Sequence, residues 1–145
     1  MKIAISACLA GDSVRYDASN KRNDDLLSLL KDHEIIKICP EISADLTIPR
    51  DPIEILNNHV ITSNNIDITD KLYKGCLKCF EMIKDCDFVI LKDKSPSCGY
   101  GKIYDGTFSN KLIDGNGIFT DLCLRKNIKV FNEKQLAEIK EHIFQ

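Results

Sequence analysis

The sequence lacks several features that would mark particular classes of protein. No apolar run approaches the roughly 20 residues of a membrane-spanning helix. There is no internal repeat, no low-complexity tract and no block of basic residues that could follow a phosphate backbone. The 20 basic and 22 acidic residues are mixed along the chain and give a formal charge of −2. We therefore expect no membrane segment and no nucleic-acid partner, and a small molecule is the better candidate ligand.

Cysteine, in contrast, is abundant, with seven residues in a chain of 145. The odd number and the irregular spacing differ from the disulfide frameworks of small secreted proteins. Metal binding or thiol chemistry in a reducing compartment fits this pattern better. The apolar run at the N-terminus is too short for a secretory signal, and Asp12 follows it almost at once. These features predict a cytoplasmic protein whose first residues form a strand.

Hydrophobic periodicity predicts one α/β domain over residues 1–145 with a mostly parallel sheet. The chain is 43% hydrophobic, which is enough for a single core, and apolar runs of strand length alternate with segments of helical period. The fully apolar strand Phe88–Leu91 is expected at the centre of the sheet. The predicted strands are Lys2–Ser6, Ile35–Ile38, Phe88–Leu91 and Lys129–Phe131, and the predicted helices are Asp24–Asp32, Thr69–Lys84 with Thr69 as N-cap, Asn116–Lys126 and Glu133–Ile143.

Two stretches between these elements are expected to be irregular. The first runs from Pro40 to about Asn65, contains Pro49 and Pro52, and has at most a short strand at His59–Thr62. The second is a glycine-rich loop from Asp93 to Gly106. Loops of this kind, placed by a rigid sheet, commonly carry functional residues.

Three cysteines share one position in this scheme. Cys8 follows the first strand, Cys39 ends the second, and Cys98 lies in the loop after Phe88–Leu91. Ligands of an open parallel sheet bind outside the carboxyl ends of its strands, so residues far apart in sequence can meet there. We expect Cys8, Cys39 and Cys98 to lie close enough to share one cofactor.

Thiolates suit soft metals, so zinc and iron-sulfur clusters are both candidates on ligand type alone. A structural zinc site usually takes paired knuckles such as Cys-x-x-Cys, and none of the three cysteines has a close cysteine neighbour. Three thiolates on three loops instead suggest an iron-sulfur cluster in which one iron has no protein ligand and is open to substrate. Spacing alone leaves the alternative of buried apolar thiols, because free cysteine is among the most buried residue types.

The remaining cysteines are better explained by packing. Cys76 and Cys79 form a Cys-x-x-Cys sequence, but with Leu72, Phe80 and Ile83 they fall at helical spacing within one predicted helix. A redox pair would instead lie at a helix N-terminus, where the dipole lowers the thiol pKa. We therefore expect Cys76 and Cys79 to face the core, and we expect the same of Cys86 and Cys123.

Several polar residues lie close to these cysteines in sequence. Glu41 is two residues from Cys39, so it is a candidate base beside a bound metal, or else an N-cap or salt-bridge residue. Ser95 and Ser97 precede Cys98 and could simply form a turn. Arg50 could orient a planar ligand that carries oxygen atoms, or pair with Glu54.

Six short motifs follow one another along about four fifths of the chain. They are Ile-Ser-Ala-Cys-Leu-Ala-Gly, Val14-Arg15-Tyr16-Asp17, Cys39-Pro40-Glu41, Pro49-Arg50 with Pro52 and Glu54, Ser95-Pro96-Ser97-Cys98-Gly99 and Tyr104-Asp105-Gly106-Thr107-Phe108. Taken together and in this order, they resemble the thiouracil desulfurase family, long catalogued as a bacterial domain of unknown function. Glycines common in the family after Tyr-Asp and before Leu-x-x-Pro-Arg are replaced here by Ala18 and by Ala44-Asp45.

The resemblance implies a Rossmann-like domain in which Cys8, Cys39 and Cys98 hold a 4Fe-4S cluster. It also implies that 2-thiouracil is converted to uracil, with the sulfur accepted by the iron that has no protein ligand. The family's catalytic glutamate and serine match Glu41 and Ser95. The substrate contacts expected from the same motifs are Ser97, Arg50 and Tyr104.

Two other functions remain open at this point. In the first, Cys98 carries a persulfide without iron, and sulfur transfer persists after metal removal. In the second, the protein binds a cluster or zinc without catalysis. Turnover of a thiolated pyrimidine by anaerobically reconstituted protein distinguishes these functions from a desulfurase.

Overall fold

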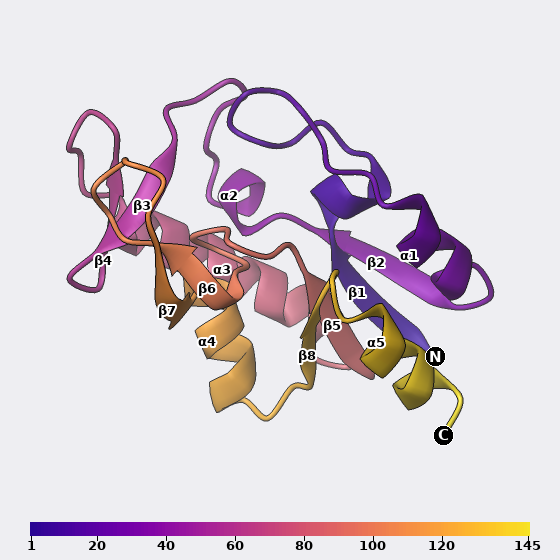
Figure 1. Cartoon of the computed structure of the whole chain (residues 1–145). Coiled ribbons are helices and arrows are strands. Elements are labelled where there is room, and N and C mark those ends of the chain that lie inside the picture. The colour runs from indigo at the N-terminus through magenta and orange to yellow at the C-terminus, as the bar shows by residue number, and fades with distance from the viewer.

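The computed structural model describes residues 1–145 as an α/β fold around a four-stranded parallel sheet (Figure 1). The order of its strands is β2-β1-β5-β8. These strands are β1 (Lys2–Ser6), β2 (Glu34–Ile38), β5 (Phe88–Leu91) and β8 (Val130–Asn132). All four match predicted strands within a residue or two, and the parallel pairing confirms the expected fold class.

Helices cover both faces of this sheet and produce two apolar clusters. On one face, side chains of α3 (Thr69–Ile83) and α4 (Ile118–Arg125) pack against alternate strand residues. On the other face, α1 (Asp24–Leu30) and α5 (Leu136–Ile143) cover the remaining strand residues. The alternation is visible in β1, where Ala4 faces the first cluster while Ile3 and Ile5 face the second. None of the helices combines the length and apolar character needed to span a bilayer.

The two stretches expected to be irregular contain antiparallel hairpins and short helices. The hairpins, β3 with β4 and β6 with β7, lie at the same end of the molecule in Figure 1. Of these strands, only β4 was predicted. The additional elements are η1 (Ala7–Ala10), α2 (Pro40–Ser43), β3 (Ile53–Leu56), β4 (His59–Thr62), β6 (Tyr100–Tyr104) and β7 (Leu112–Asn116).

The predicted N-cap of α3 is wrong. The cap position is Ile68, and Thr69 is the first helical residue. The Thr69 hydroxyl instead accepts a hydrogen bond from the Val60 backbone N–H at 2.9 Å and donates to Asp67 at 2.6 Å. The side chain that could have capped the helix therefore joins it to β4.

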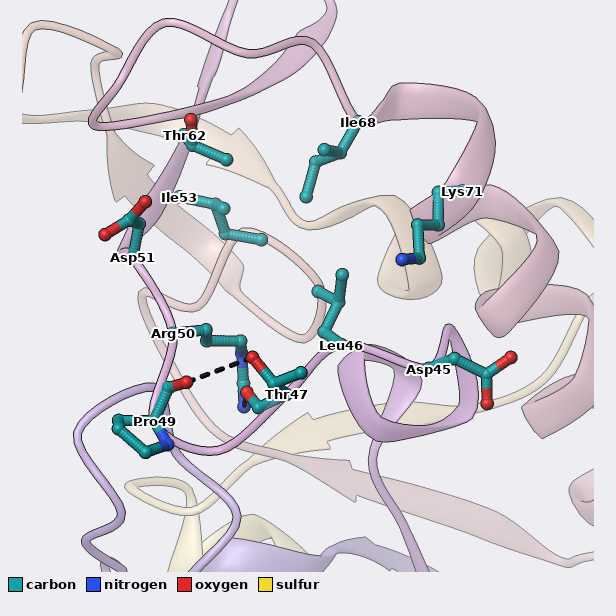
Figure 2. Close-up of a pocket in the computed structure, with 10 residues that line it drawn as sticks. All are labelled: Asp45, Leu46, Thr47, Pro49, Arg50, Asp51, Ile53, Thr62, Ile68 and Lys71. Atoms are coloured by element: carbon teal, nitrogen blue, oxygen red, sulfur yellow. Dashed lines mark hydrogen bonds between the residues drawn. The ribbon is translucent and has the colours of Figure 1, made fainter.

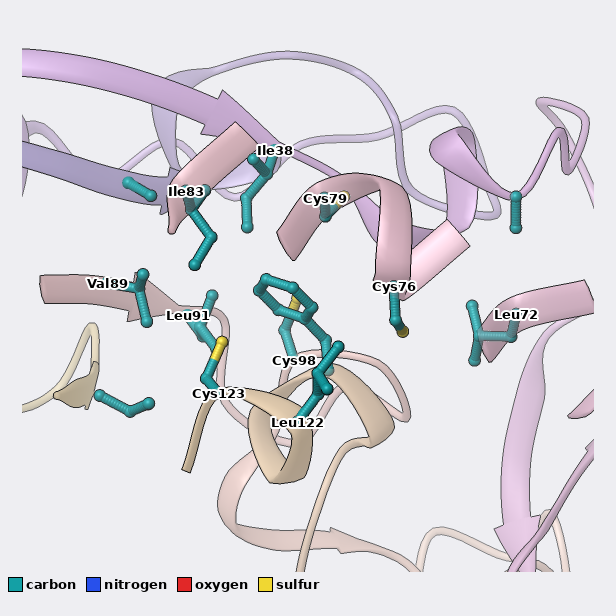
Figure 3. Packing of buried hydrophobic residues seen from close by; sticks show 14 of the residues in the cluster. Ile38, Leu72, Cys76, Cys79, Ile83, Val89, Leu91, Cys98, Leu122 and Cys123 are labelled. Carbon is teal, nitrogen blue, oxygen red and sulfur yellow. The ribbon is translucent and has the colours of Figure 1, made fainter. Parts of the chain in front are cut away.

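The cysteines of α3 face the core, as their spacing predicted (Figure 3). Cys76 and Cys79 are fully buried, and so is Cys123 on α4. The Cys79 thiol donates to the Ser43 hydroxyl of α2 at 3.3 Å, which joins two helices. Cys86 is also buried, in the turn after α3. All seven cysteines are free thiols.

Gly75 brings the backbones of α2 and α3 unusually close together. A Cβ atom at this position would lie 2.3 Å from the Pro40 carbonyl oxygen and 2.6 Å from the Ala44 nitrogen. Both of these are backbone atoms, so neither can move without displacing α2. The missing side chain thus determines where α2, and with it Glu41, lies relative to the sheet.

We predict that Gly75→Ala destabilises the protein by about 1–3 kcal/mol, the usual cost of overpacking a close contact. In an exposed helix the same change stabilises by roughly 1 kcal/mol, so the predicted sign is reversed. Anaerobic urea denaturation measures the difference, with the exposed neighbour Lys74→Ala as a control that stays within about 0.5 kcal/mol of the parent. A Gly75→Ala protein as stable as the parent contradicts the proposed role of this contact.

Candidate functional site

The structure brings Cys8, Cys39 and Cys98 together at the carboxyl edge of the parallel sheet. Cys8 lies in η1 directly after β1, Cys39 lies between β2 and α2, and Cys98 lies in the loop after β5. All three line one cavity of about 540 Å³. Cys8 and Cys98 are buried, whereas Cys39 is partly exposed. The sheet therefore places three distant thiols around one space, as the sequence pattern indicated.

The three thiols also affect one another electrostatically. The pKa of Cys8 is raised to about 11, chiefly by burial and also by the neighbouring Cys39 thiol. Burial likewise raises the pKa of Cys39, and it raises that of Cys98 well above the ordinary value of a thiol. Cys39 and Cys8 add to the effect on Cys98, since three negative charges in one place repel one another. A bound metal centre offsets this repulsion and displaces the thiol protons.

The arrangement of the thiols fits a polynuclear cluster better than a single ion. No three histidine, cysteine, aspartate or glutamate side chains lie close enough to hold one metal ion. In a 4Fe-4S cluster each thiolate binds a different iron, so the ligands are spread more widely than in a tetrahedral zinc site. Three soft ligands around one cavity match a cluster with one iron free of protein ligands.

The start of α4 holds the loop that carries Cys98. The backbone N–H groups of Gly117, Ile118 and Phe119 donate to carbonyls of the loop at 2.7, 3.0 and 2.8 Å. A Cβ atom on Gly117 would lie 2.4 Å from the carbonyl carbon of Ser97, so only glycine allows this approach. The free N–H groups of a helix N-terminus thus determine the position of the cysteine loop.

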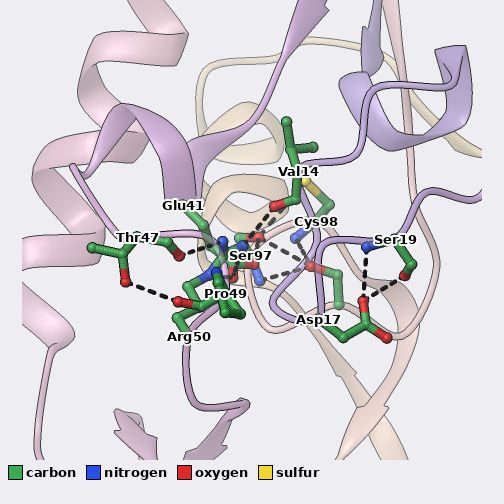
Figure 4. A network of polar contacts seen from close by, with 10 residues as sticks. Val14, Asp17, Ser19, Glu41, Thr47, Pro49, Arg50, Ser97 and Cys98 are labelled. Atoms are coloured by element: carbon green, nitrogen blue, oxygen red, sulfur yellow. Dashed lines mark hydrogen bonds and ion pairs between the residues drawn. The ribbon is translucent and has the colours of Figure 1, made fainter.

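A chain of polar side chains connects this loop to α2 (Figure 4). The Ser95 hydroxyl accepts the backbone N–H groups of Ser97 and Cys98 at 3.2 and 3.0 Å and lies 3.0 Å from the Ser97 hydroxyl. The Ser97 hydroxyl donates to the Glu41 carboxylate at 3.0 Å. Because Glu41 can only accept, the hydroxyl proton of Ser95 is left to donate to Ser97 or to a ligand in the cavity.

The other oxygen of Glu41 forms an ion pair with Arg50. The Nε and one terminal nitrogen of Arg50 donate to it at 3.2 and 2.9 Å. The two side chains are only 8% and 14% exposed, so both charges are largely removed from water. Arg50 also donates to the carbonyls of Val14 and Thr47, at 2.9 and 3.0 Å. Its guanidinium group is therefore already surrounded by acceptors.

Glu54 is not the partner of Arg50, so the alternative pairing considered from the sequence is wrong. The carboxylate of Glu54 instead accepts the backbone N–H groups of Gly106 and Phe108 at 3.0 and 3.1 Å. These two hydrogen bonds connect β3 with the loop that follows β6. Glu54 thereby stabilises one wall of the cavity.

Tyr104, at the end of β6, lines the same cavity, together with Tyr16 and Phe108. Flat aromatic rings suit a planar heterocycle. The structure also adds lining residues that sequence analysis did not select, among them Ser6 and Lys92. Ser6 is the last residue of the apolar strand β1, and Lys92 directly follows the apolar strand β5. A position at a strand end is the same signal that identified the cysteines.

A second, more open cavity of about 520 Å³ adjoins the first (Figure 2). Arg50 and Ile53 line both cavities. The Thr47 hydroxyl donates to the Pro49 carbonyl across one side of this second space, at 3.0 Å. No cysteine is among its lining residues. Thiol and cluster chemistry therefore belongs to the first cavity.

Two residues near the site have a backbone conformation that favours glycine. Ala18 and Asp45 have φ angles of +63° and +62°, in the left-handed region. Both lie in loops that follow motif residues of the site. A side chain at each of these positions has a local cost of about 1 kcal/mol.

Comparisons with known proteins agree with the geometry. A family model described as 2-thiouracil desulfurase matches residues 3–135. The protein YbbK of Bacillus subtilis (strain 168), described as uncharacterized, is 32% identical over 149 residues, which cover 94% of this chain and 99% of YbbK. A solved structure, described as the 4Fe-4S-dependent thiouracil desulfidase TudS, is 36% identical with a TM-score of 0.90, and the match covers 98% of this chain and 97% of TudS. The chain belongs to the 2-thiouracil desulfurase family.

Proposed function

We propose that this protein removes sulfur from thiolated pyrimidines such as 2-thiouracil, with a 4Fe-4S cluster on Cys8, Cys39 and Cys98. The observation that carries the proposal is the convergence of three thiols from three strand ends on one cavity. Family membership and the match to a 4Fe-4S-dependent thiouracil desulfidase support it. The persulfide alternative needs only Cys98 and gives no reason for Cys8 and Cys39 to line the same space.

When bound, the cluster supplies a Lewis-acidic iron that can polarise a carbon–sulfur bond. Side chains of the protein carry out the remaining steps. In the net reaction, water replaces the sulfur of the thiocarbonyl group: a carbon–oxygen bond forms, the carbon–sulfur bond breaks and the sulfur leaves as sulfide. The attacking water must lose a proton, and Glu41 can accept it, either directly or through the hydroxyls of Ser97 and Ser95. Arg50 keeps the carboxylate of Glu41 in place through its ion pair.

The substrate contacts within this proposal differ from residue to residue. Tyr104 is free to stack on, or hydrogen-bond to, a pyrimidine in the cavity. Ser97 is buried and already donates to Glu41, and Arg50 makes four hydrogen bonds to Glu41, Val14 and Thr47. We therefore propose that Tyr104 contacts the substrate, whereas Ser97 and Arg50 hold Glu41 in the position needed for catalysis.

The proposal also includes the compartment in which the protein works and the kind of partner that it binds. An iron that is open to substrate is open to oxygen as well, and seven free thiols require a reducing compartment. The cytoplasm meets this requirement. A cavity of 540 Å³ suits a small molecule, and we propose neither a membrane nor a nucleic acid as a partner.

We predict that Cys8→Ser, Cys39→Ser and Cys98→Ser each abolish cluster binding, because each removes one thiolate ligand. Cys76→Ala is the matched control, since it removes a thiol that is fully buried in the core, outside the cavity, and should only reduce stability. Iron and sulfide content after anaerobic reconstitution measures the effect. Loss of iron in Cys76→Ala, with retention in Cys8→Ser, would reverse the assignment.

A second prediction concerns Glu41→Gln, which keeps the shape of the side chain but cannot accept a proton. The amide oxygen can still accept from Arg50, so we expect the loops to stay in place, a normal iron content and a decrease in turnover of roughly 10² or more, the range that a general base usually supplies. The absorbance change on conversion of thiouracil to uracil measures turnover. Parent-like turnover by a fully loaded Glu41→Gln protein would eliminate Glu41 as the base and leave Ser95 as the next candidate.

A further inference from the structure

A group of charged side chains lies at the same edge of the sheet and has no role in the function proposed above. It consists of Lys92, Asp93, Glu133 and Lys134. Lys92 and Asp93 follow β5 and line the cysteine cavity, and Glu133 follows β8. The side chains of Lys92, Asp93 and Glu133 are 20%, 10% and 8% exposed. Burial of three charged groups is costly unless they are paired, so this arrangement needs an explanation.

Lys92 and Cys8 follow neighbouring strands. Ile5 of β1 pairs with Ile90 of β5, so the two strands run side by side to this edge of the sheet. The backbone N–H of Lys92 donates to the hydroxyl of Ser6, the last residue of β1, at 2.9 Å. Cys8 follows Ser6 by two residues, and Lys92 and Cys8 line the same cavity.

Two carboxylates hold the ammonium group of Lys92 in this position. The Lys92 Nζ donates to the Asp93 carbonyl at 3.1 Å and pairs with the Asp93 carboxylate. It also lies 3.4 Å from Glu133. Glu133 in turn accepts the Asp93 backbone N–H at 2.9 Å, which ties the end of β8 to the end of β5. A flexible lysine normally extends into water, but this one is fixed at the wall of the cavity.

A loaded site carries a net negative charge. Three thiolates outweigh the charge of the inorganic core of a 4Fe-4S cluster, so the cluster with its cysteines is an anion. We propose that Lys92 is the fixed cation that offsets this negative charge, and that Asp93 and Glu133 are positioning residues for its ammonium group. A positive charge beside the cluster stabilises its reduced form and so raises its reduction potential, and it makes the open iron a stronger Lewis acid.

The midpoint potential of the cluster tests this inference, because a merely structural residue would not shift it. The measurement is a reductive titration of anaerobically reconstituted protein, followed by electron paramagnetic resonance. We expect Lys92→Met to lower the potential and Lys92→Arg to keep it near the parent value. Lys134→Met is the matched control, since Lys134 also pairs with Asp93, at 3.4 Å, but its side chain is 66% exposed and its charge is screened by water. It should leave the potential unchanged.

A second variant covers the case in which Lys92→Met does not accept a cluster because its carboxylates are left unpaired. Lys92→Gln removes the positive charge but leaves an amide that can donate to Asp93 or Glu133, and it should lower the potential as Lys92→Met does. A parent-like potential in Lys92→Met, or in Lys92→Gln, overturns the inference. So does an equal shift in Lys134→Met.

The inference rests on the proposed function only through the cluster on the three cysteines. The potential is measured without substrate, so it does not depend on which thiolated compound is turned over. If the cluster loads and the potential responds as expected while thiouracil is not converted, the proposed substrate fails and the role of Lys92 stands. If thiouracil is converted and Lys92→Met leaves the potential unchanged, the role of Lys92 fails alone.

Discussion

The buried ion pair between Arg50 and Glu41 is the interaction on which the arrangement of the site depends. Removing two opposite charges from water costs several kcal/mol, and their attraction offsets this only when the remaining donors and acceptors are satisfied. Here they are: Arg50 also donates to the carbonyls of Val14 and Thr47, and Glu41 accepts from Ser97. One guanidinium group thus connects the loop after η1, the loop after α2 and, through Glu41, the loop that carries Cys98. These loops surround the cavity.

The parallel sheet accounts for the second constraint, the convergence of residues from distant parts of the sequence. Each of β1, β2 and β5 ends at the same edge, and each is followed within a few residues by a cysteine that lines the cavity. The remaining cysteines lie on α3 and α4 or in the turn between α3 and β5, where they are buried in the first apolar cluster. Position relative to the strand ends, and not the Cys-x-x-Cys spacing, separates the two sets. Chemically identical side chains therefore lie in different surroundings in one small chain.

The sequence was sufficient to predict the parts of the fold that depend on local pattern. The four apolar strands and the helix that carries Leu72 and Ile83 are accurate because burial on a sheet or a helix face leaves a clear periodicity. The hairpin of β6 and β7 was missed because Leu112 and Ile113 are exposed and glycines interrupt both strands. The two strands pair with each other and bury little of either face. The sequence therefore has no apolar pattern that indicates them.

The contacts of the site likewise include some that the sequence predicts and some that it does not. The convergence of the cysteines could be predicted because topology alone requires it, but the partner of Arg50 could not. Glu54 is the nearer of the two in sequence, four residues from Arg50 against nine for Glu41, and only the position of α2, set by the close contact at Gly75, makes Glu41 the partner. The roles of Ser97 and Lys92 depend likewise on long-range contacts with Glu41 and Glu133.

The central claim is that desulfuration depends on a cluster held by three cysteines, and one measurement tests it most directly. Purified protein is reconstituted anaerobically with iron and sulfide, and its conversion of 2-thiouracil to uracil is compared with that of the same protein after the iron has been removed by a chelator. The account predicts conversion in proportion to the iron bound, and none after its removal. Equal conversion by the iron-free protein would contradict it and would favour a persulfide on Cys98.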